Sequence, residues 1–267
     1  MVSTAPMKSA RTLLPDERRR LIARHIRERG SAAVAELEEQ FGVSAMTARR
    51  DLVALERQGV VRRTHGGAVF PGLSSHEDSF YQRLELAIPA KERLAEAALG
   101  ELTAGEAIFV DSSTTSYYAC RRIVQENFPC TLLTNAIPVM ELVCEAEAPR
   151  VEVIGVGGMM RKLTCSFVGP QAVRAIESHT ADRVLFSVRG LAADGQLTDP
   201  DPLEAEVKRA MVAGARRAIL LVDGSKFDRP ALSVIANVRD VSLVLAADEP
   251  RHALALVADA GAEVRSV

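Results

Sequence analysis

The sequence predicts a two-domain α/β protein, with a small helical N-terminal domain that ends in a basic hairpin and a larger domain built on a mostly parallel sheet. Its 267 residues exceed the roughly 100–200 residues of one typical domain. Residues 1–70 hold 13 Lys and Arg against 8 Asp and Glu, whereas the remainder holds 20 against 27. Short apolar runs alternate with helical segments in the second part. A basic part beside an acidic one suggests that the first part meets nucleic acid.

The basic part is organised around residues 43–68, VSAMTARRDLVALERQGVVRRTHGGA, which predict a helix followed by a hairpin. Ser44 can cap this helix by accepting a hydrogen bond from a free backbone N–H. One face is apolar and suited to packing, and it consists of Ala48, Leu52 and Leu55. The opposite face points outward and consists of Met46, Arg50, Val53 and Arg57, with Thr47 and Arg49 on its flanks. Arginines near the N-terminal end of a helix are typical of a recognition helix in the major groove of DNA.

Two further helices are expected before this stretch. The first covers residues 14–29, with one side buried (Leu14, Leu21, Ile22, Ile26) and one side in solvent (Arg18, Arg19, Arg20), and the second begins at Ser31. Helix, short turn and helix with outward arginines form the helix-turn-helix pattern. The run after Gly59 suits a β-wing, with Arg62, Arg63 and His65 placed to contact DNA phosphates. A helical hairpin without a nucleic-acid role is the simpler alternative.

These signals divide the chain into four segments. We predict a disordered tail (1–13), a winged helix-turn-helix DNA-binding domain (14–70), a linker (71–90) and an α/β effector-binding domain (91–267). The four cysteines form no C-x-x-C pair, so no metal site is expected, and no cofactor is expected either. No apolar run approaches the about 18 residues of a membrane span, and the N-terminus lacks a signal-peptide pattern. We therefore expect a cytoplasmic protein without a membrane partner.

Six apolar runs rich in Val, Ile and Leu predict the strands of the second domain. They cover residues 107–111, 131–135, 151–158, 183–190, 218–226 and 241–248. Such runs, separated by helical segments, indicate a largely parallel sheet covered by helices. Right-handed crossovers then place the loops that follow the strands at one edge of the sheet, where ligands bind in open α/β folds.

Those loops carry many hydroxyl, small and basic residues. Asp111 and Ser112–Thr115 follow the first strand and open a helix, where hydroxyls and free N–H groups suit a phosphate. A simple capping turn is the alternative interpretation of this run. The other loops contribute Thr134, Asn135, Gly157, Gly158, Arg161, Arg189, Gly190 and Lys226. Five loops of this kind at one edge favour a site for an anionic ligand over a set of unrelated turns.

Segments of both predicted domains resemble a single protein family. The segments VSAMTARRDL, LERQG and RTHGGA resemble the winged head of the DeoR family of bacterial transcriptional regulators. The body resembles the effector domain of that family through DSSTT, LLTNA, GVGGMMR with SFVGP, GQLTDP, EVKRAM and DGSK. FYQRLELAIPAKERLAEAAL resembles its bridging helix, with Arg83 and Lys91 in the usual basic places. The family's effector domain is related to ribose-phosphate isomerases and glucosamine-phosphate deaminases.

The resemblance implies a DNA-binding regulator, in particular a repressor of a carbohydrate-metabolism operon, whose operator binding responds to a phosphorylated sugar. Its contacts to double-stranded operator DNA would come from Ser44, Thr47, Arg49 and Arg50. Its phosphate loop would consist of Asp111, Ser113, Thr114 and Thr115, with further contacts from Thr134, Asn135, Gly157, Gly158, Arg161 and Lys226. Ser113 departs from the family, which usually has glycine there. Because one short helix contacts few base pairs, we expect a homo-oligomer, a dimer or tetramer.

The alternative function is a sugar-phosphate isomerase or deaminase with an accessory DNA-binding head. Proton transfer between adjacent sugar carbons needs a carboxylate base close to the carbon acid. The loop that follows the fourth strand, residues 187–191, offers no carboxylate. We therefore expect a ligand-controlled switch and no enzymatic activity.

Overall fold

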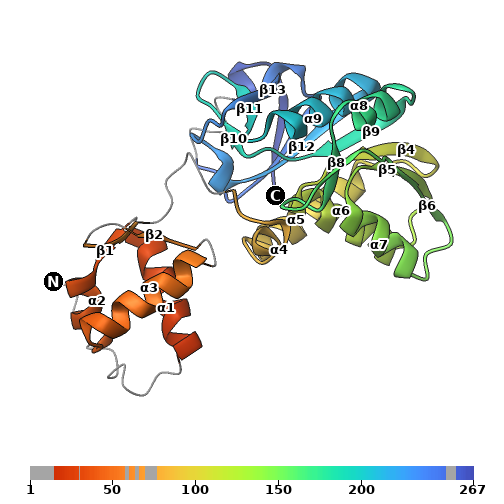
Figure 1. Ribbon diagram of the computed structural model, residues 1–267. Helices are drawn as coiled ribbons and strands as arrows, with labels where there is room; N and C mark the ends of the chain where they lie inside the picture. The colour runs from red at the N-terminus through yellow and green to blue at the C-terminus, as the bar shows by residue number, and fades with distance from the viewer. Residues whose placement is uncertain (1–14, 30, 58–59, 64–65, 70–76, 251–256) are drawn as a thin grey trace. The chain divides into compact units, whose positions relative to one another are not determined.

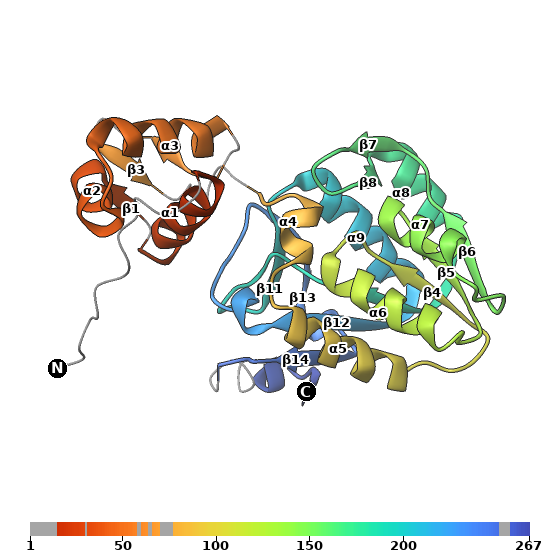
Figure 2. The ribbon, with the colours of Figure 1, turned by 90° about the horizontal axis from the view of Figure 1, so that it is seen from below.

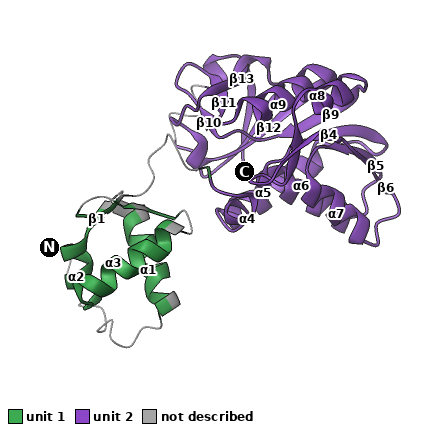
Figure 3. Cartoon of the chain, in the orientation of Figure 1, with its two compact units in different colours: residues 1–77 green, residues 78–267 purple. Residues whose placement is uncertain are grey.

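The computed structural model describes residues 15–29, 31–57, 60–63, 66–69, 77–250 and 257–267. They fall into two compact units, Met1–Glu77 and Asp78–Val267, which Figure 3 colours separately. The boundary differs from the expected linker over 71–90, because residues 78–90 belong to the larger unit and hold helix α4 (Phe80–Leu84). The tail expected over residues 1–13 lies outside the described residues.

The first unit packs three helices against a small antiparallel sheet (Figure 1). Its elements are α1 (Pro15–Arg29), β1 (Ser31–Ala33), α2 (Val34–Phe41), α3 (Ala45–Arg57), β2 (Arg62–Arg63) and β3 (Gly67–Val69). The sheet order is β1-β3-β2, and the apolar core gathers residues from all three helices. Gly42 ends α2 with a positive φ of 60°, which glycine adopts without strain, and this turn leads directly to α3. The predicted winged helix-turn-helix is confirmed.

Two details of this unit correct the sequence-based expectations. Ser31 begins strand β1, and the second helix begins only at Val34, because residues 31–33 pair with β3. Gly67 allows this pairing, since a Cβ there would lie 2.2 Å from the carbonyl oxygen of Ala32. Arg18 is buried instead of solvated, because its guanidinium pairs with Asp51 of α3. That partner is 33 residues away in sequence and gives no local signal.

Seven parallel strands form the central sheet of the second unit, in the order β15-β14-β12-β9-β4-β5-β6 (Figures 1 and 2). Their bounds are β4 (Glu106–Val110), β5 (Cys130–Thr134), β6 (Val151–Gly155), β9 (Ala181–Phe186), β12 (Ala215–Asp223), β14 (Leu243–Ala247) and β15 (Glu263–Ser266). The first six overlap the predicted apolar runs, so the predicted mostly parallel sheet is confirmed. The edge strand β15 was not predicted.

Helices cover both faces of this sheet. One apolar core lies beneath α5 (Ile88–Gly100), α6 (Thr114–Gln125) and α7 (Ile137–Glu145), and the other beneath α8 (Pro170–Glu177) and α9 (Pro202–Gly214). Two small antiparallel additions were not predicted. They are the hairpin of β7 (Met159–Arg161) with β8 (Ser166–Val168), and the sheet of β10 (Gly190–Leu191), β11 (Gln196–Asp199) and β13 (Ser233–Asn237).

The strand order reverses between β4 and β9. From β4 the chain proceeds outward through β5 to β6, and from β9 it proceeds the other way through β12 and β14 to β15. The connections after β4 and β9 therefore lead to opposite sides at the carboxyl ends of these strands. Open α/β sheets bind their ligands at such a switch point. The segments that follow β4 and β9 are therefore the expected place for a ligand in the second unit.

Candidate functional site

The exposed face of α3 is the candidate DNA-contacting surface of the first unit. Ser44 caps the helix as predicted: its Oγ accepts a 3.3 Å hydrogen bond from the backbone N–H of Thr47, and the two hydroxyls lie 3.0 Å apart. Arg49 and Arg50 are exposed on the following turn. Two cationic side chains beside a capped helix N-terminus are suited to phosphate and base-edge contacts.

Two of the predicted wing residues, Arg62 and Arg63, form strand β2. Arg63 is exposed, and its backbone N–H donates a 2.9 Å hydrogen bond to Glu56 of α3. This bond fixes the start of the wing on the end of α3. Arg62 belongs to β2, whereas His65 lies outside the described residues.

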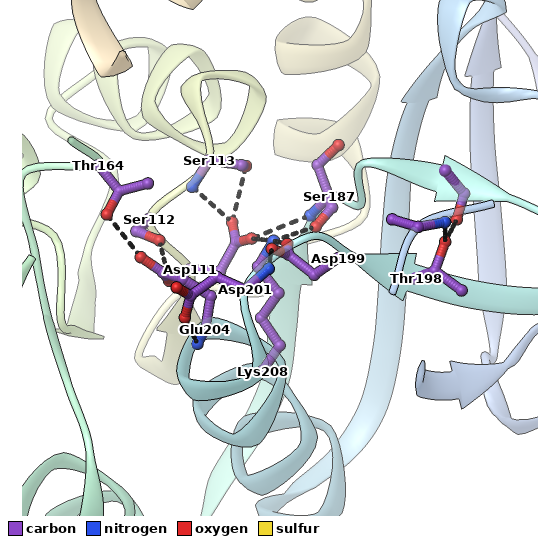
Figure 4. A network of polar contacts seen from close by, with 12 residues as sticks. Asp111, Ser112, Ser113, Thr164, Ser187, Thr198, Asp199, Asp201, Glu204 and Lys208 are labelled. Carbon is purple, nitrogen blue, oxygen red and sulfur yellow. Dashed lines mark hydrogen bonds and ion pairs between the residues drawn. The ribbon is translucent and has the colours of Figure 1, made fainter. Parts of the chain in front are cut away.

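In the second unit, Asp111 and Lys208 connect the two sides of the switch point (Figure 4). Asp111 follows β4, and its carboxylate accepts hydrogen bonds from the Ser113 N–H (3.2 Å), the Ser113 hydroxyl (2.7 Å) and the Ser187 N–H (3.3 Å). The Lys208 ammonium of α9 lies 3.4 Å from Asp111 Oδ2 and 2.7 Å from Asp199 Oδ2, and it donates to the Ser187 carbonyl oxygen at 2.9 Å. Both loops are therefore held by one buried ion-pair network.

The pKa shifts of Lys208 and Asp199 agree with this pairing. Burial lowers the pKa of Lys208, but the negative charges of Asp199 and Asp111 outweigh burial, so that the pKa is raised above its ordinary value. Burial alone would raise the pKa of Asp199, yet the adjacent Lys208 ammonium lowers it. Both groups are consequently charged at neutral pH.

The predicted phosphate loop is buried and largely bonded to itself. The Ser113 hydroxyl donates to Asp111 and accepts the Ser116 N–H at 3.1 Å, so Ser113 is the N-cap of α6. Thr114 and Thr115 form the first turn of this helix and are 4% and 3% exposed. The run is therefore a capping turn, as the alternative interpretation has it, and it places the N-terminus of α6 just after β4.

A second buried carboxylate, Glu204 of α9, joins the loop after β4 to the β7–β8 hairpin (Figure 4). It accepts hydrogen bonds from the hydroxyls of Ser112 (2.8 Å), Thr164 (2.6 Å) and Ser166 (2.6 Å). Arg161 lies beside this group, with its Nε 3.0 Å from Asp201 Oδ2. The predicted ligand contact Arg161 is thus already paired with an acidic side chain.

Some of the remaining predicted ligand contacts bond within the protein, and others have an atom or space that a ligand could use. Thr134 donates to the Val110 carbonyl oxygen at 2.8 Å, which ties β5 to β4. Asn135 donates to the Phe167 carbonyl oxygen, but its buried Oδ1 has no partner among the described residues. Gly158 lets the chain approach β8, since a Cβ there would lie 2.8 Å from the Val168 carbonyl oxygen, whereas a Cβ at Gly157 would meet open space.

Lys226 follows β12 in the turn η2 (Gly224–Lys226), and its charge acts on other basic side chains and is acted on by them. Burial, followed by the charges of Arg189, Arg83 and Lys208, lowers the pKa of Lys226, against the opposing effect of Asp223. Burial and then the charge of Lys226 lower the pKa of Lys91 to about 8. We call Arg83, Lys91, Arg189 and Lys226 the basic cluster.

The basic cluster has little compensation from acidic groups. Asp223, 3.9 Å from the Lys226 ammonium, is the one carboxylate within ion-pair distance of the cluster in the described part of the chain. Lys91 donates to the backbone oxygens of Arg83 and Leu84. The buried Nε and Nη2 of Arg83 have no partner among the described residues, and neither does the buried hydroxyl of Ser187. Unpartnered buried donors beside excess positive charge indicate a place for an anion.

Sequence reasoning missed several of these residues. Asp199, Glu204 and Lys208 are not among the site residues that the sequence predicts, although Glu204 and Lys208 stand four apart in EAEVK (204–208) and therefore share one helix face. Arg83 and Lys91 were singled out only by their places in the bridging segment. The predicted contacts lie mainly at the ends of strands, whereas Arg83, Glu204 and Lys208 come from helices.

Other kinds of site find no support in the described residues. They contain no cluster of three or more His, Cys, Asp or Glu side chains that could bind a metal. No helix among them has the length and apolarity needed to cross a membrane. Cys120 and Cys130 are free and buried, and burial raises the pKa of Cys130 to about 11 and that of Cys120 well above its ordinary value. Thiols of this kind are poor nucleophiles.

Comparisons with known families match both units. A family model described as the DeoR-like helix-turn-helix domain matches residues 18–72, and one described as the DeoR C terminal sensor domain matches residues 87–247.

Several curated proteins are similar along most of their length. A putative aga operon transcriptional repressor of Escherichia coli O157:H7 is 31% identical and covers 93% of this chain and 92% of its own. The HTH-type transcriptional repressor CsqR of Escherichia coli K12 is 32% identical over 86% of both chains. The L-fucose operon activator of Haemophilus influenzae is 30% identical over 84% of this chain and 88% of its own.

Among solved structures, ribose 5-phosphate isomerase A from Methanocaldococcus jannaschii matches with a TM-score of 0.38 and 14% identity. The match covers 52% of this chain and about half of the isomerase, 54%. The eIF2B delta subunit from Chaetomium thermophilum matches with a TM-score of 0.45 and 16% identity, over 61% of this chain and 57% of its own.

Proposed function

Because this chain belongs to the DeoR family of transcriptional regulators, we propose that it represses a carbohydrate-metabolism operon and that a phosphorylated sugar modulates its binding to the operator. The exposed side chains of Arg49, Arg50 and Arg63 supply the DNA-contacting surface. The switch point of the α/β sheet supplies the effector site. The basic cluster is the observation that carries the second assignment, since among the described residues only the Asp223 carboxylate lies within ion-pair distance of its four cations.

Within this proposal the phosphate lies between the basic cluster and the N-terminus of α6. Lys226 and Arg83 neutralise its charge, and the helix dipole favours it from the other side. The sugar hydroxyls then meet the unpartnered atoms of Ser187 and Asn135, because a buried acceptor such as Asn135 Oδ1 needs a donor. Thr114, Thr115, Gly157 and Arg161 remain proposed contacts along the same edge.

The effector signal has a short covalent route toward the DNA-binding unit. Arg83 lies on α4, which begins three residues after the boundary between the two units. The N–H of Phe80 in α4 also donates to the Leu163 carbonyl oxygen in the β7–β8 hairpin, at 2.7 Å. A ligand that draws Arg83 or this hairpin to itself would displace α4. A coupling of about 1–3 kcal/mol changes operator affinity by about 5- to 150-fold.

Regulation without turnover fits the chemistry of the switch point better than isomerisation. A general base must be free to take a proton from carbon. Asp111 and Asp199 are both held by Lys208, and Asp111 accepts three further hydrogen bonds. The relatives named above are regulators of transcription. We also propose that the protein acts in the cytoplasm as a dimer or tetramer. One recognition helix contacts too few base pairs to specify an operator, so two or more are needed.

Thermal unfolding of the full chain with a panel of sugar phosphates tests the effector assignment. We expect at least one phosphorylated sugar to raise the unfolding midpoint, because a ligand that binds only the folded state stabilises it. Its unphosphorylated counterpart and inorganic phosphate serve as controls. Midpoints that stay unchanged across pentose, hexose and amino-sugar phosphates would contradict the proposal, and product formation from any of them would contradict the absence of catalysis.

A further inference from the structure

The orientation of α3 in the first unit is fixed by its buried face. Ala48, Asp51, Leu52 and Leu55 are at most 3% exposed. The Arg18 guanidinium holds Asp51 with two contacts, 2.6 Å from Nε to Oδ2 and 3.3 Å from Nη2 to Oδ1. A buried bidentate pair fixes direction as well as distance. The face opposite these residues is therefore held toward solvent.

Met46 lies on that outward face, in the first turn of α3, and is 81% exposed. It precedes Ala48 by two residues, which places it about 160° around the helix from the packing face. It is the one large apolar side chain that is exposed among the described residues of the first unit. Leaving this much apolar surface in water has no benefit for folding.

The chemistry around Met46 is that of a DNA-contacting surface. Arg49 and Arg50 are exposed nearby, and neither forms an ion pair with a described residue. The hydroxyls of Ser44 and Thr47 share one hydrogen bond, which leaves one hydroxyl hydrogen of the pair to donate to DNA. Hydrogen-bonding contacts at this end of α3 can therefore come from these hydroxyls and from the arginines, which suit phosphates and guanine edges.

Met46 has no hydrogen-bonding group to offer, so it needs an apolar partner. In the major groove the thymine C5-methyl is that partner, since the other base edges present donors and acceptors. We propose that Met46 packs against the methyl group of one thymine in each half-site and sets the base preference at that position. This inference rests on operator binding through α3.

Selection of binding sequences from a random duplex library tests it. The full chain is compared with Met46→Ala, Met46→Leu and a matched control, Leu232→Ala, which truncates a side chain that is 82% exposed in the other unit. We expect Met46→Ala to lose the thymine preference at one position per half-site and keep the others, while Met46→Leu and the control keep all. The same preferences in Met46→Ala and the wild type would overturn the inference. If the wild type selects no motif, operator recognition itself fails, and this inference with it.

Uracil substitution in the selected operator isolates the methyl group, because uracil keeps every hydrogen-bonding atom of thymine. At one thymine per half-site we expect wild-type affinity to fall roughly fourfold, the factor for burying one methyl-sized group. Met46→Ala should be insensitive to that substitution. An equal loss in both proteins, or no loss at any thymine, would overturn the assignment.

Discussion

The Glu204 carboxylate accepts a 2.8 Å hydrogen bond from the hydroxyl of Ser112, and this contact joins α9 to the loop that follows β4. The same carboxylate accepts two hydroxyls from the β7–β8 hairpin, so one buried group holds three segments that are far apart in sequence. It is 2% exposed. The shape of the proposed effector site therefore depends on a residue that need not touch the effector.

Replacing Glu204 with Gln tests this dependence. The amide has one acceptor oxygen, so a hydroxyl that donates to the carboxylate must turn and accept from the NH₂ group, and the bonds to the charged carboxylate become weaker neutral ones. We expect the free energy of unfolding to fall by about 1–3 kcal/mol, because hydrogen bonds to a charged group contribute more than neutral ones. Glu206→Gln changes an exposed carboxylate on the same helix and is the matched control. Equal urea midpoints for both variants would contradict the structural role of Glu204.

Lys91 predicts a pH dependence of effector binding. Burial and the Lys226 charge lower its pKa to about 8, against the opposing charge of Asp223, with Arg83 and Glu85 also nearby. An anionic ligand favours the ammonium form, so binding takes up a proton and affinity falls as pH rises through about 8. The phosphate stays dianionic from about pH 7 to about pH 9 and does not contribute.

Isothermal titration in buffers of different ionisation enthalpy measures this proton uptake. Lys91→Arg keeps the positive charge throughout this pH range and should flatten the dependence. An affinity that is constant between about pH 7 and about pH 9 in the wild type, or equally steep in Lys91→Arg, would exclude Lys91 from the site.

Two arginines of the first unit should differ in what they contribute. Arg50→Ala removes a base-edge contact, so we expect a loss of about 1–3 kcal/mol on the operator and a smaller loss on unrelated DNA. Arg63→Ala removes a phosphate contact, so both affinities should fall together and the salt slope should decrease by about 1. Fluorescence anisotropy at several salt concentrations separates them. A uniform loss for Arg50→Ala would rule out base recognition by that residue.

Lys226→Ala should separate effector response from DNA binding. Lys226 lies in the second unit, so operator affinity without effector should stay unchanged. The shift caused by the effector should disappear, because the basic cluster loses the cation nearest to Asp223. Lys162→Ala, an exposed lysine in the same unit, is the control and should respond like the wild type. A normal response in Lys226→Ala would remove this residue from the proposed site.

Much of the fold could be predicted because buried parallel strands need continuous apolar runs, and six of the seven strands have them. The edge strand β15 reads Glu-Val-Arg-Ser and is mostly exposed, so no apolar signal marks it. Short antiparallel strands such as β11 and β13 depend on pairing between distant segments. Arg18 was misplaced for a similar reason, since its burial depends on Asp51 in another helix.

The site could be predicted only where it lies at strand ends. Asp111 and Lys226 follow strands directly, and both lie in or beside the switch point. Glu204 and Lys208 lie on α9, where sequence periodicity predicts exposure or capping for polar residues. Their burial follows from the packing of α9 on β9 and β12, which no local pattern encodes.

The central claim is that effector binding in the second unit changes operator binding by the first. The most direct test measures affinity of the full chain for its selected operator with and without the sugar phosphate that raises its unfolding midpoint. The account predicts a change of about 5- to 150-fold with the phosphorylated sugar and none with its unphosphorylated form. The same operator affinity in the presence and absence of a saturating sugar phosphate would contradict it.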